Sequence, residues 1–170
     1  LNFVKIDWPA APAPERHRRS LYMFRRRSMP DPVMASFDAP NADFACVRRQ
    51  RSNTPMAALA SLNEPVFVEA AQALALRTLR EGGATDESRA NHAFRLCVGR
   101  LPGEEERAAV LDLLHSQSQR VADGWLPARE LATGGDTLPA VPPGTNPRQL
   151  AAWTIVSRVL LNLDETLTKN

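Results

Sequence analysis

Three segments of this chain begin with the same signal, a polar residue followed by proline and then by apolar residues at three- and four-residue spacing. The three starts are Asn53-Thr54-Pro55, Asn63-Glu64-Pro65 and Asn146-Pro147. A polar side chain before a helix can accept a hydrogen bond from a free backbone N–H. Proline suits the first helical position because its missing N–H would have no partner there. The repeated signal therefore predicts a chain built from helices.

Apolar spacing and terminating glycines predict where these helices lie. A further helix is capped by Thr85 or Asp86 and ends at Gly99. The bounds predicted for the other helices are 55–62, 65–81, 103–122 and 147–163, with a small helical piece at 127–132. The helix at 147–163 is apolar on more than one face, so we expect it to be central. The predicted fold class is mostly α, a compact helical domain of four main helices plus a short one, with an irregular Pro/Arg-rich N-terminal arm.

We expect one helical domain over residues 1–170 that is an excerpt of a longer protein, since the sequence does not begin with Met. Its predicted parts are an irregular basic arm (1–52), helices 1–4 and the short helix (53–132), a loop (133–147), and a C-terminal helix and tail (148–170). Prolines argue against long helices in the arm. The segment 20–27 fits either a strand or two helical turns, and we favour helix. We expect four aromatic residues to hold the arm on the helical body: Trp8, Tyr22, Phe24 and Phe37.

The positive charge of the chain is concentrated in its first third. Residues 1–53 contain ten Lys/Arg and five Asp/Glu, whereas residues 54–170 contain eleven and fourteen. Since the excess is modest and the remainder is acidic, we expect no nucleic-acid partner. No run approaches the ~18 apolar residues of a membrane-spanning helix, so we expect no membrane span in this chain.

An arginine cluster directly precedes the first of the three helix starts and is the first candidate site. Guanidinium groups beside a helix N-terminus can bind phosphate, sulfate or a carboxylate. The alternative is that the arginines tie the arm to carboxylates such as Glu64, Glu69 or Asp164, or face solvent, and we favour this alternative. The candidate anion- or partner-binding residues are Arg48, Arg49, Arg51, Asn53 and Thr54.

A second group of polar residues lies at two helix ends and forms a possible polar cluster. Its oxygen atoms can coordinate a hard cation. The segment lacks, however, the acidic residues at alternate positions and the glycine turn that a calcium-binding loop has. We favour the other interpretation, in which the amides satisfy backbone groups and the carboxylates pair with arginines. The residues of this cluster are Asn63, Glu64, Asn162, Asp164 and Glu165. The three histidines are scattered, and we predict no metal site.

The sequence leaves open whether the protein is an enzyme. No serine lies in a Gly-x-Ser-x-Gly turn, and we predict no catalytic residue. A pair of carboxylates on separate elements would leave no sequence trace, however. The two cysteines are too few for a disulfide framework. We expect Cys97 to be buried and Cys46 to be the more exposed, although a single bridge between them stays open.

Five ordered segments resemble one known family: RRSLYMF (18–24), FDAP (37–40), and the stretches 46–71, 93–106 and 150–166. The strongest signal is the pair of turns at 51–55 (RSNTP) and 62–65 (LNEP). The chain is similar to a planctomycete-specific C-terminal domain of unknown function, from large exported proteins that often carry a cytochrome-c-like module. This resemblance implies a periplasmic or extracellular parent with haem c possible in an upstream domain. The chain itself lacks Cys-x-x-Cys-His, so we expect no cofactor in it.

Two hypotheses for the function follow. In the first, the chain is a non-catalytic structural or interaction module that docks upstream domains or another protein through the arm and the loop 133–147. In the alternative, it completes an enzyme active site shared with upstream domains, either polysaccharide-active or linked to electron transfer. If the candidate polar residues lie together around one solvent-open pocket, the enzyme hypothesis gains support. If they are instead engaged in helix caps and ion pairs, the module hypothesis gains support. The residues that decide this are Arg49, Asn53, Asn63, Asp164 and Glu165.

Overall fold

The computed structural model describes most of the helical part of the chain and portions of the arm. The described residues are 11, 15–23, 25, 30–40, 44–48, 53–133 and 141–168. All regular secondary structure in these ranges is helical, and they contain no strand. The predicted fold class, a compact helical domain, is therefore confirmed.

The helices of the body have nearly the predicted bounds. They are α2 (Pro55–Asn63), α3 (Pro65–Glu81), α4 (Asp86–Val98), α5 (Glu104–Ala122), α6 (Ala128–Thr133), α7 (Pro147–Leu161) and α8 (Asp164–Leu167). The one difference of substance is at the C-terminal end. The predicted helix at 147–163 stops at Leu161, and a separate short helix, α8, follows it.

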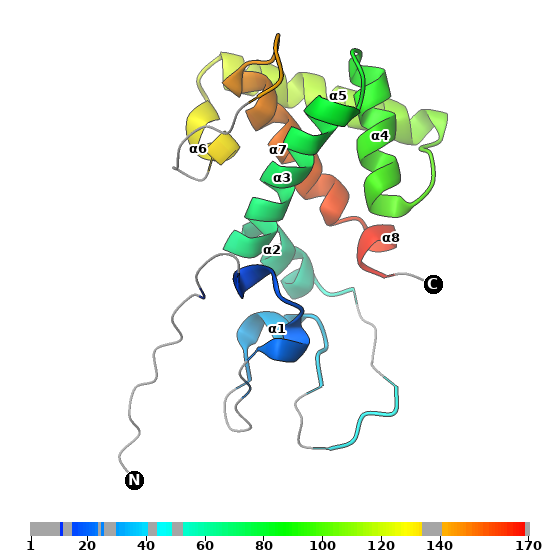
Figure 1. The fold of residues 1–170 in the computed structure, drawn as a ribbon. Coiled ribbons are helices and arrows are strands. Elements are labelled where there is room, and N and C mark those ends of the chain that lie inside the picture. The colour runs from blue at the N-terminus through cyan, green and yellow to red at the C-terminus, as the bar shows by residue number, and fades with distance from the viewer. Residues whose placement is uncertain are drawn as a thin grey trace.

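Helix α7 is the central element of the body. Figure 1 shows α7 passing behind α3, with α5 and α6 at one end of it and α8 at the other. Eight of its 15 residues are buried, and they include Trp153, Leu150 and Val156. A helix that is apolar on more than one face has to be enclosed by its neighbours, so the predicted central position is confirmed.

The closest partner of α7 is α3, and small side chains line both helices. Ala71, Ala75 and Thr78 are fully buried on α3, as are Ala151 and Thr154 on α7. Because these side chains are short, the two backbones can approach closely along a whole face. Helices α3 and α7 therefore form a closely packed pair, and the remaining helices pack around this pair.

The predicted helix caps are largely present. Thr54 Oγ1 accepts a hydrogen bond from the Ala57 N–H (3.1 Å), and Asn146 Oδ1 accepts one from the Gln149 N–H (2.9 Å). Gly99 ends α4 with a φ of 91°, in the left-handed region that favours glycine. Helix α3 differs, because Glu64 precedes its proline without making a side-chain cap.

The arm has more helical structure than expected, all of it short. Residues Glu15–His17 (η1) and Ser20–Tyr22 (η2) form single 3-10 turns, so the segment predicted as a helix at 20–27 begins with a helical turn, and its residues 24, 26 and 27 lie outside the described residues. Helix α1 (Pro32–Ser36) was not predicted, although Asp31 caps it through the Met34 N–H at 2.9 Å. The described parts of the arm lie beside α2, at the end of the molecule opposite α5 (Figure 1).

Two contacts attach the arm to α3. The rings of Phe37 and Phe67 pack with centroids 5.5 Å apart, as expected of Phe37. Glu69 pairs with Arg16 at 2.7 Å and with His17 at 3.2 Å. The expectation that Tyr22 also holds the arm is wrong, because its side chain is 69% exposed. Trp8 and Phe24 lie outside the described residues.

Candidate functional site

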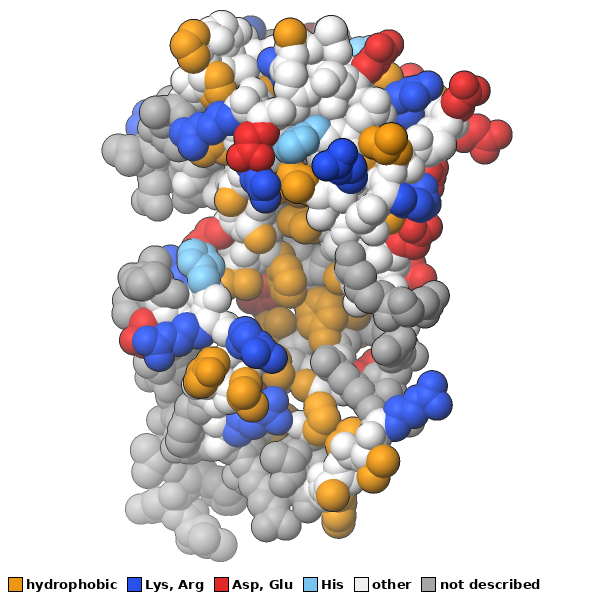
Figure 2. Space-filling view, turned by 45° about the vertical axis from the view of Figure 1, so that its right-hand side comes forward, with side chains coloured by type: hydrophobic (Ala, Val, Ile, Leu, Met, Phe, Trp, Pro, Cys, Tyr) orange, Lys and Arg blue, Asp and Glu red, His pale blue; other side chains and the backbone are white. Residues whose placement is uncertain are grey.

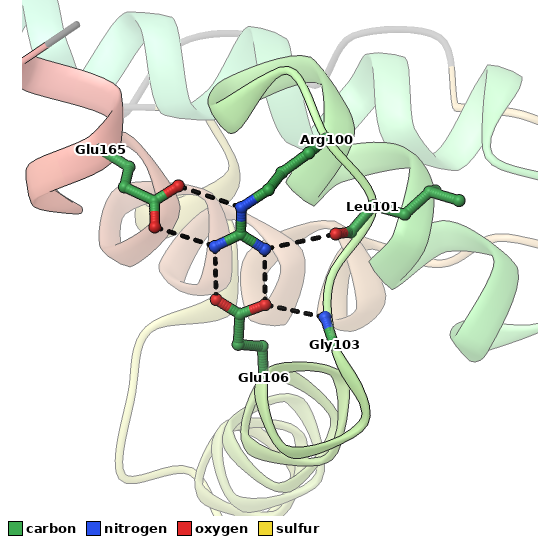
Figure 3. Close-up of polar contacts among 5 residues, drawn as sticks. All are labelled: Arg100, Leu101, Gly103, Glu106 and Glu165. Carbon is green, nitrogen blue, oxygen red and sulfur yellow. Dashed lines mark hydrogen bonds and ion pairs between the residues drawn. The ribbon is translucent and has the colours of Figure 1, made fainter. Parts of the chain in front are cut away.

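The densest polar cluster among the described residues is centred on Arg100, directly after the glycine that ends α4. Its Nη1 and Nη2 each donate to Glu106 at 2.7 Å, while its Nε and Nη2 donate to Glu165 at 3.1 and 2.8 Å. A further bond runs from Nη1 to the Leu101 carbonyl at 3.3 Å. Figure 3 shows the guanidinium enclosed on both sides by the two carboxylates.

The guanidinium of Arg100 has no donor left for a ligand. Arginine carries five N–H groups, and the five hydrogen bonds to Glu106, Glu165 and Leu101 account for all of them. The Cζ atom also lies 5.2 Å from the centre of the Phe94 ring, within the range of a cation–π contact. The cluster is thus a satisfied structural junction, which we call the Arg100 junction (Arg100, Glu106 and Glu165).

The charges of the junction shift each other's protonation. Hydrogen bonds from Arg100, and then one from the Gly103 N–H at 2.7 Å, lower the pKa of Glu106 from 4.5 to about 2. The two carboxylates, Glu106 foremost, raise the pKa of Arg100. All three side chains are close to half exposed, so water screens the attraction. Arg100 and Glu106 therefore both stay ionised near neutral pH.

A second set of polar contacts fastens α2 to the end of α7. Asn53 Nδ2 donates to Asp164 Oδ1 at 3.0 Å, and Ser61 Oγ donates to Asn162 Oδ1 at 2.9 Å. Arg158 reaches back from α7 to the Leu62 carbonyl. These bonds join positions about a hundred residues apart in the chain, so they fix one end of the body.

The two predicted site clusters have different outcomes. The structure brings Asn53 to Asp164, and it places Asn162 and Glu165 in neighbouring contacts at the same end of α7. Asn63 instead donates to the Leu59 carbonyl of its own helix at 2.8 Å, and Glu64 has no side-chain partner among the described residues. The polar cluster predicted from sequence is therefore only partly assembled.

The arginine cluster can be followed only in part. Arg48 is exposed and forms no ion pair within the described residues, while Arg49 and Arg51 lie outside them. Thr54 is used as the cap of α2. The favoured interpretation is that these arginines bind carboxylates such as Glu64, Glu69 or Asp164, or face solvent, and the exposed Arg48 agrees with its second part. An arginine of the arm does bind Glu69, but it is Arg16.

The predicted residues that the structure describes form no metal centre, and they do not line the open pocket beside α6 and the start of α7. In the parts of the chain that the structure describes, no three His, Cys, Asp or Glu side chains come together as metal ligands. An open pocket of about 420 Å³ is lined by Ala128, Arg129, Asn146, Pro147 and Arg148, none of which was predicted as a site residue. Cys46 is exposed, Cys97 is buried, and no disulfide joins them. None of the helices described is long and apolar enough to cross a membrane.

Sequence reasoning missed Arg100 and Glu106, the core of the junction. A signal for them exists, because both lie in the segment GRLPGEEE, where a Pro-Gly turn separates an arginine from three glutamates. The Pro-Gly turn reverses the chain and places Glu106 close to Arg100, so the ion pair could have been predicted from this segment.

The fold and this geometry define a helical domain whose polar side chains fasten its helices to one another. The chain belongs to the PSD1 family, described as proteins of unknown function (DUF1553), because the family model matches residues 4–114, more than half of its length. The match ends inside α5, so the central helix α7 lies beyond it. No significant match is found to a curated protein or to a solved structure.

Proposed function

We propose that the chain is a non-catalytic structural and interaction module at the C-terminus of an exported multidomain protein. One observation carries this proposal: four of the polar side chains predicted as site residues are engaged within the fold. Asn53 bonds Asp164, Asn63 bonds its own helix, and Glu165 bonds Arg100. Side chains held in this way stabilise the fold and are not available to a substrate.

The proposed setting of the module rests on the family resemblance. The segments at 18–24, 37–40, 46–71, 93–106 and 150–166 are similar to a planctomycete-specific domain from exported proteins that often carry a cytochrome-c-like module. We therefore place haem c, where present, in an upstream domain, and the parent in the periplasm or outside the cell. The membership in a family of unknown function is consistent with this setting.

The surface that we propose for docking includes the outer face of α2. This helix contains no charged residue and is apolar on several faces, which is unusual for a helix at a surface. Met56 and Leu59 are nevertheless 64% and 55% exposed. Because they are three residues apart, they lie on one side of α2. An upstream domain that covers them would bury apolar surface on both partners.

The experiment is a binding measurement between the 170-residue chain and the separately produced upstream region of its parent, by calorimetry. We expect Met56→Glu with Leu59→Glu to weaken binding at least tenfold, because two carboxylates would have to be buried. The matched control is Trp125→Glu, which places a charge at another exposed apolar position. Equal affinity of the double variant and the native chain would overturn the role of α2. Absence of binding by the native chain would overturn the proposed function itself.

No contact among the described residues favours the alternative of a shared active site. Its candidate residues Asn53, Asp164 and Glu165 point to partners within the fold. The same parent protein tests it, because Asp164→Asn should then alter turnover without altering thermal stability. The module predicts a loss of stability and no specific loss of turnover.

A further inference from the structure

The arm presents an apolar surface bordered by arginines. Leu21, Tyr22 and Met23 are consecutive and exposed, the first two at 69% each. Arg19 precedes them and Arg25 follows them, and both are exposed. Figure 2 shows arginine side chains beside hydrophobic ones in the lower half of the molecule. We call these five residues the arm patch.

No carboxylate among the described residues neutralises the positive charge of the arm patch. Arg25 donates to the Pro40 carbonyl at 3.1 Å, which leaves its charge uncompensated, and Arg19 has no ion pair among the described residues. The neighbouring Arg16 and Arg18 differ, since they pair with Glu69 and Glu15. The patch therefore combines apolar contact area with two guanidinium groups able to bind carboxylates.

A surface of opposite character lies at the turn between α4 and α5, on the side of the body where α8 lies (Figure 1). Leu101 is 61% exposed in the turn between α4 and α5, and Glu104 and Glu105 follow it in the first turn of α5. Both glutamates are exposed and form no ion pair in the described parts of the chain, whereas Glu106 is bound to Arg100. We call Leu101, Glu104 and Glu105 the α5 patch. Figure 2 shows carboxylates gathered along one edge of the upper half, away from the arm.

We propose that the arm patch of one copy binds the α5 patch of a second copy. Arginines would meet carboxylates, and the exposed apolar side chains beside them would cover Leu101. In Figure 1 the start of the arm lies beside α1 and α2, whereas the turn between α4 and α5 lies beside α8, so the two patches of one copy do not adjoin. Because each copy carries both surfaces, copies that meet in this way can join head to tail.

Such an interface is small, so the association is weak and sensitive to salt. The pairs are exposed, and the Debye length falls from about 30 Å at 0.01 M salt to about 3 Å at 1 M. The inference goes beyond the proposed function, because it needs no upstream domain and does not use the exposed face of α2. Either proposal can therefore fail without the other.

The experiment is sedimentation velocity of the 170-residue chain over a range of concentrations at low and high salt. We expect the native chain to associate at low salt and to become monomeric at high salt. Arg19→Glu with Arg25→Glu removes the arm patch, and Glu104→Gln with Glu105→Gln removes the α5 patch. Glutamine is used in place of a charge-reversing lysine, because a positive charge in the first turn of a helix is unfavourable. Each double variant alone should associate at least tenfold more weakly.

A mixture of the two double variants provides the decisive measurement. One of them retains a native α5 patch and the other a native arm patch, so the mixture should form a 1:1 complex that grows no further. The charge-matched controls change exposed residues without ion pairs elsewhere in the described chain: Arg95→Glu with Arg120→Glu, and Asp112→Asn with Glu130→Gln. Both controls should retain more of the native association than the patch variant they match.

Several results would overturn the proposal. These are a native chain that stays monomeric at low salt, patch variants that associate as well as their controls, and a mixture that forms no 1:1 complex. A monomer that sediments with vesicles of phosphatidylserine and phosphatidylcholine through Arg19 and Arg25 would also overturn it, since the arm patch would then be a membrane-binding surface. Circular dichroism identical to that of the native chain ensures that each variant is folded.

Discussion

Arg100 and Glu165 are 65 positions apart in the chain, yet two hydrogen bonds of 3.1 and 2.8 Å join the guanidinium to both carboxylate oxygens. This bidentate pair fastens α8 to the turn between α4 and α5 (Figure 3). Helix α8 has only four residues and buries none of them, so packing alone does not hold it. Its position depends on the pair with Arg100 and on the bond between Asn53 and Asp164.

Substitution of Glu165 by Gln should therefore lower the melting temperature by a small amount. The substitution keeps the shape of the side chain and removes the charge that pairs with Arg100. The effect should be smaller at high salt, where exposed ion pairs are screened. Asp112→Asn is the control, since Asp112 is exposed in the middle of α5 and forms no ion pair among the described residues. A double-mutant cycle with Arg100→Gln measures the coupling, and zero coupling would contradict the assigned pair.

The low pKa of Glu106 predicts a stability change in acid. Its pKa is about 2 in the folded chain and 4.5 without its partners, so the folded state favours the ionised form. The resulting stability is complete above about pH 4.5 and is lost as the pH falls toward about 2. Urea unfolding between these values should show a shallower pH dependence for Glu106→Gln than for the native chain. An unchanged slope would show that Glu106 is not held by Arg100.

The helices were predictable because their signals are local. Cap, proline and apolar spacing lie within a few residues of one another, and the starts at Pro55, Pro65 and Pro147 match the structure. The same signal was present at Asp31-Pro32 and was overlooked, because prolines in the arm were interpreted only as helix breakers. Helix α8 was missed for a different reason. Asn162 interrupts an apolar run that otherwise continues smoothly through Leu163.

The site was less predictable because its contacts are not local. Asn53 with Asp164 and Arg100 with Glu165 are pairs that depend on how α2 and α8 are placed by α7. The sequence indicated that Asp164 and Glu165 would pair with arginines, and Glu165 does so. It did not indicate which arginine, since several arginines in this chain are equally plausible partners. Asp164 pairs with an asparagine instead, which charge reasoning does not predict.

The link between the arm and the body is predicted to depend on Glu69. This carboxylate binds both Arg16 and His17, so Glu69→Gln should loosen the start of the arm. Trypsin should then cleave after Arg18 or Arg19 several times faster, because opening of the arm precedes cleavage. The matched control is Glu81→Gln, another half-exposed glutamate of α3, which pairs with Arg77 and His92 and not with the arm. Equal cleavage rates for the two variants would contradict the link.

Trp153 is predicted to be the most sensitive single position of the core. It is the largest fully buried side chain and lies at the middle of α7. Trp153→Ala leaves a large cavity and should destabilise the domain by about 3–5 kcal/mol, measured by urea unfolding. Trp125→Ala is the control, because Trp125 is exposed and its removal should change stability by about 0.5 kcal/mol or less. Similar losses at both positions would contradict the central place of α7.

The final prediction concerns the segment that the family model matches, residues 4–114. Helix α3 packs most extensively on α7, and α5 also packs on it, yet α7 begins only at Pro147. A chain that ends at Thr133 therefore lacks Leu150, Trp153 and the other buried side chains of the central helix. The apolar faces of α3 and α5 would then be left in water, so this chain should be largely unfolded by circular dichroism.

A chain that ends at Leu163 is the matched control for this truncation. It keeps α7 and loses only α8, and with it the contacts of Asp164 and Glu165. We expect it to fold with a lowered melting temperature, since exposed ion pairs contribute little compared with a buried helix. A folded chain ending at Thr133 would show that the matched segment has a core of its own. The result expected instead is that this fold is completed only by residues outside the match.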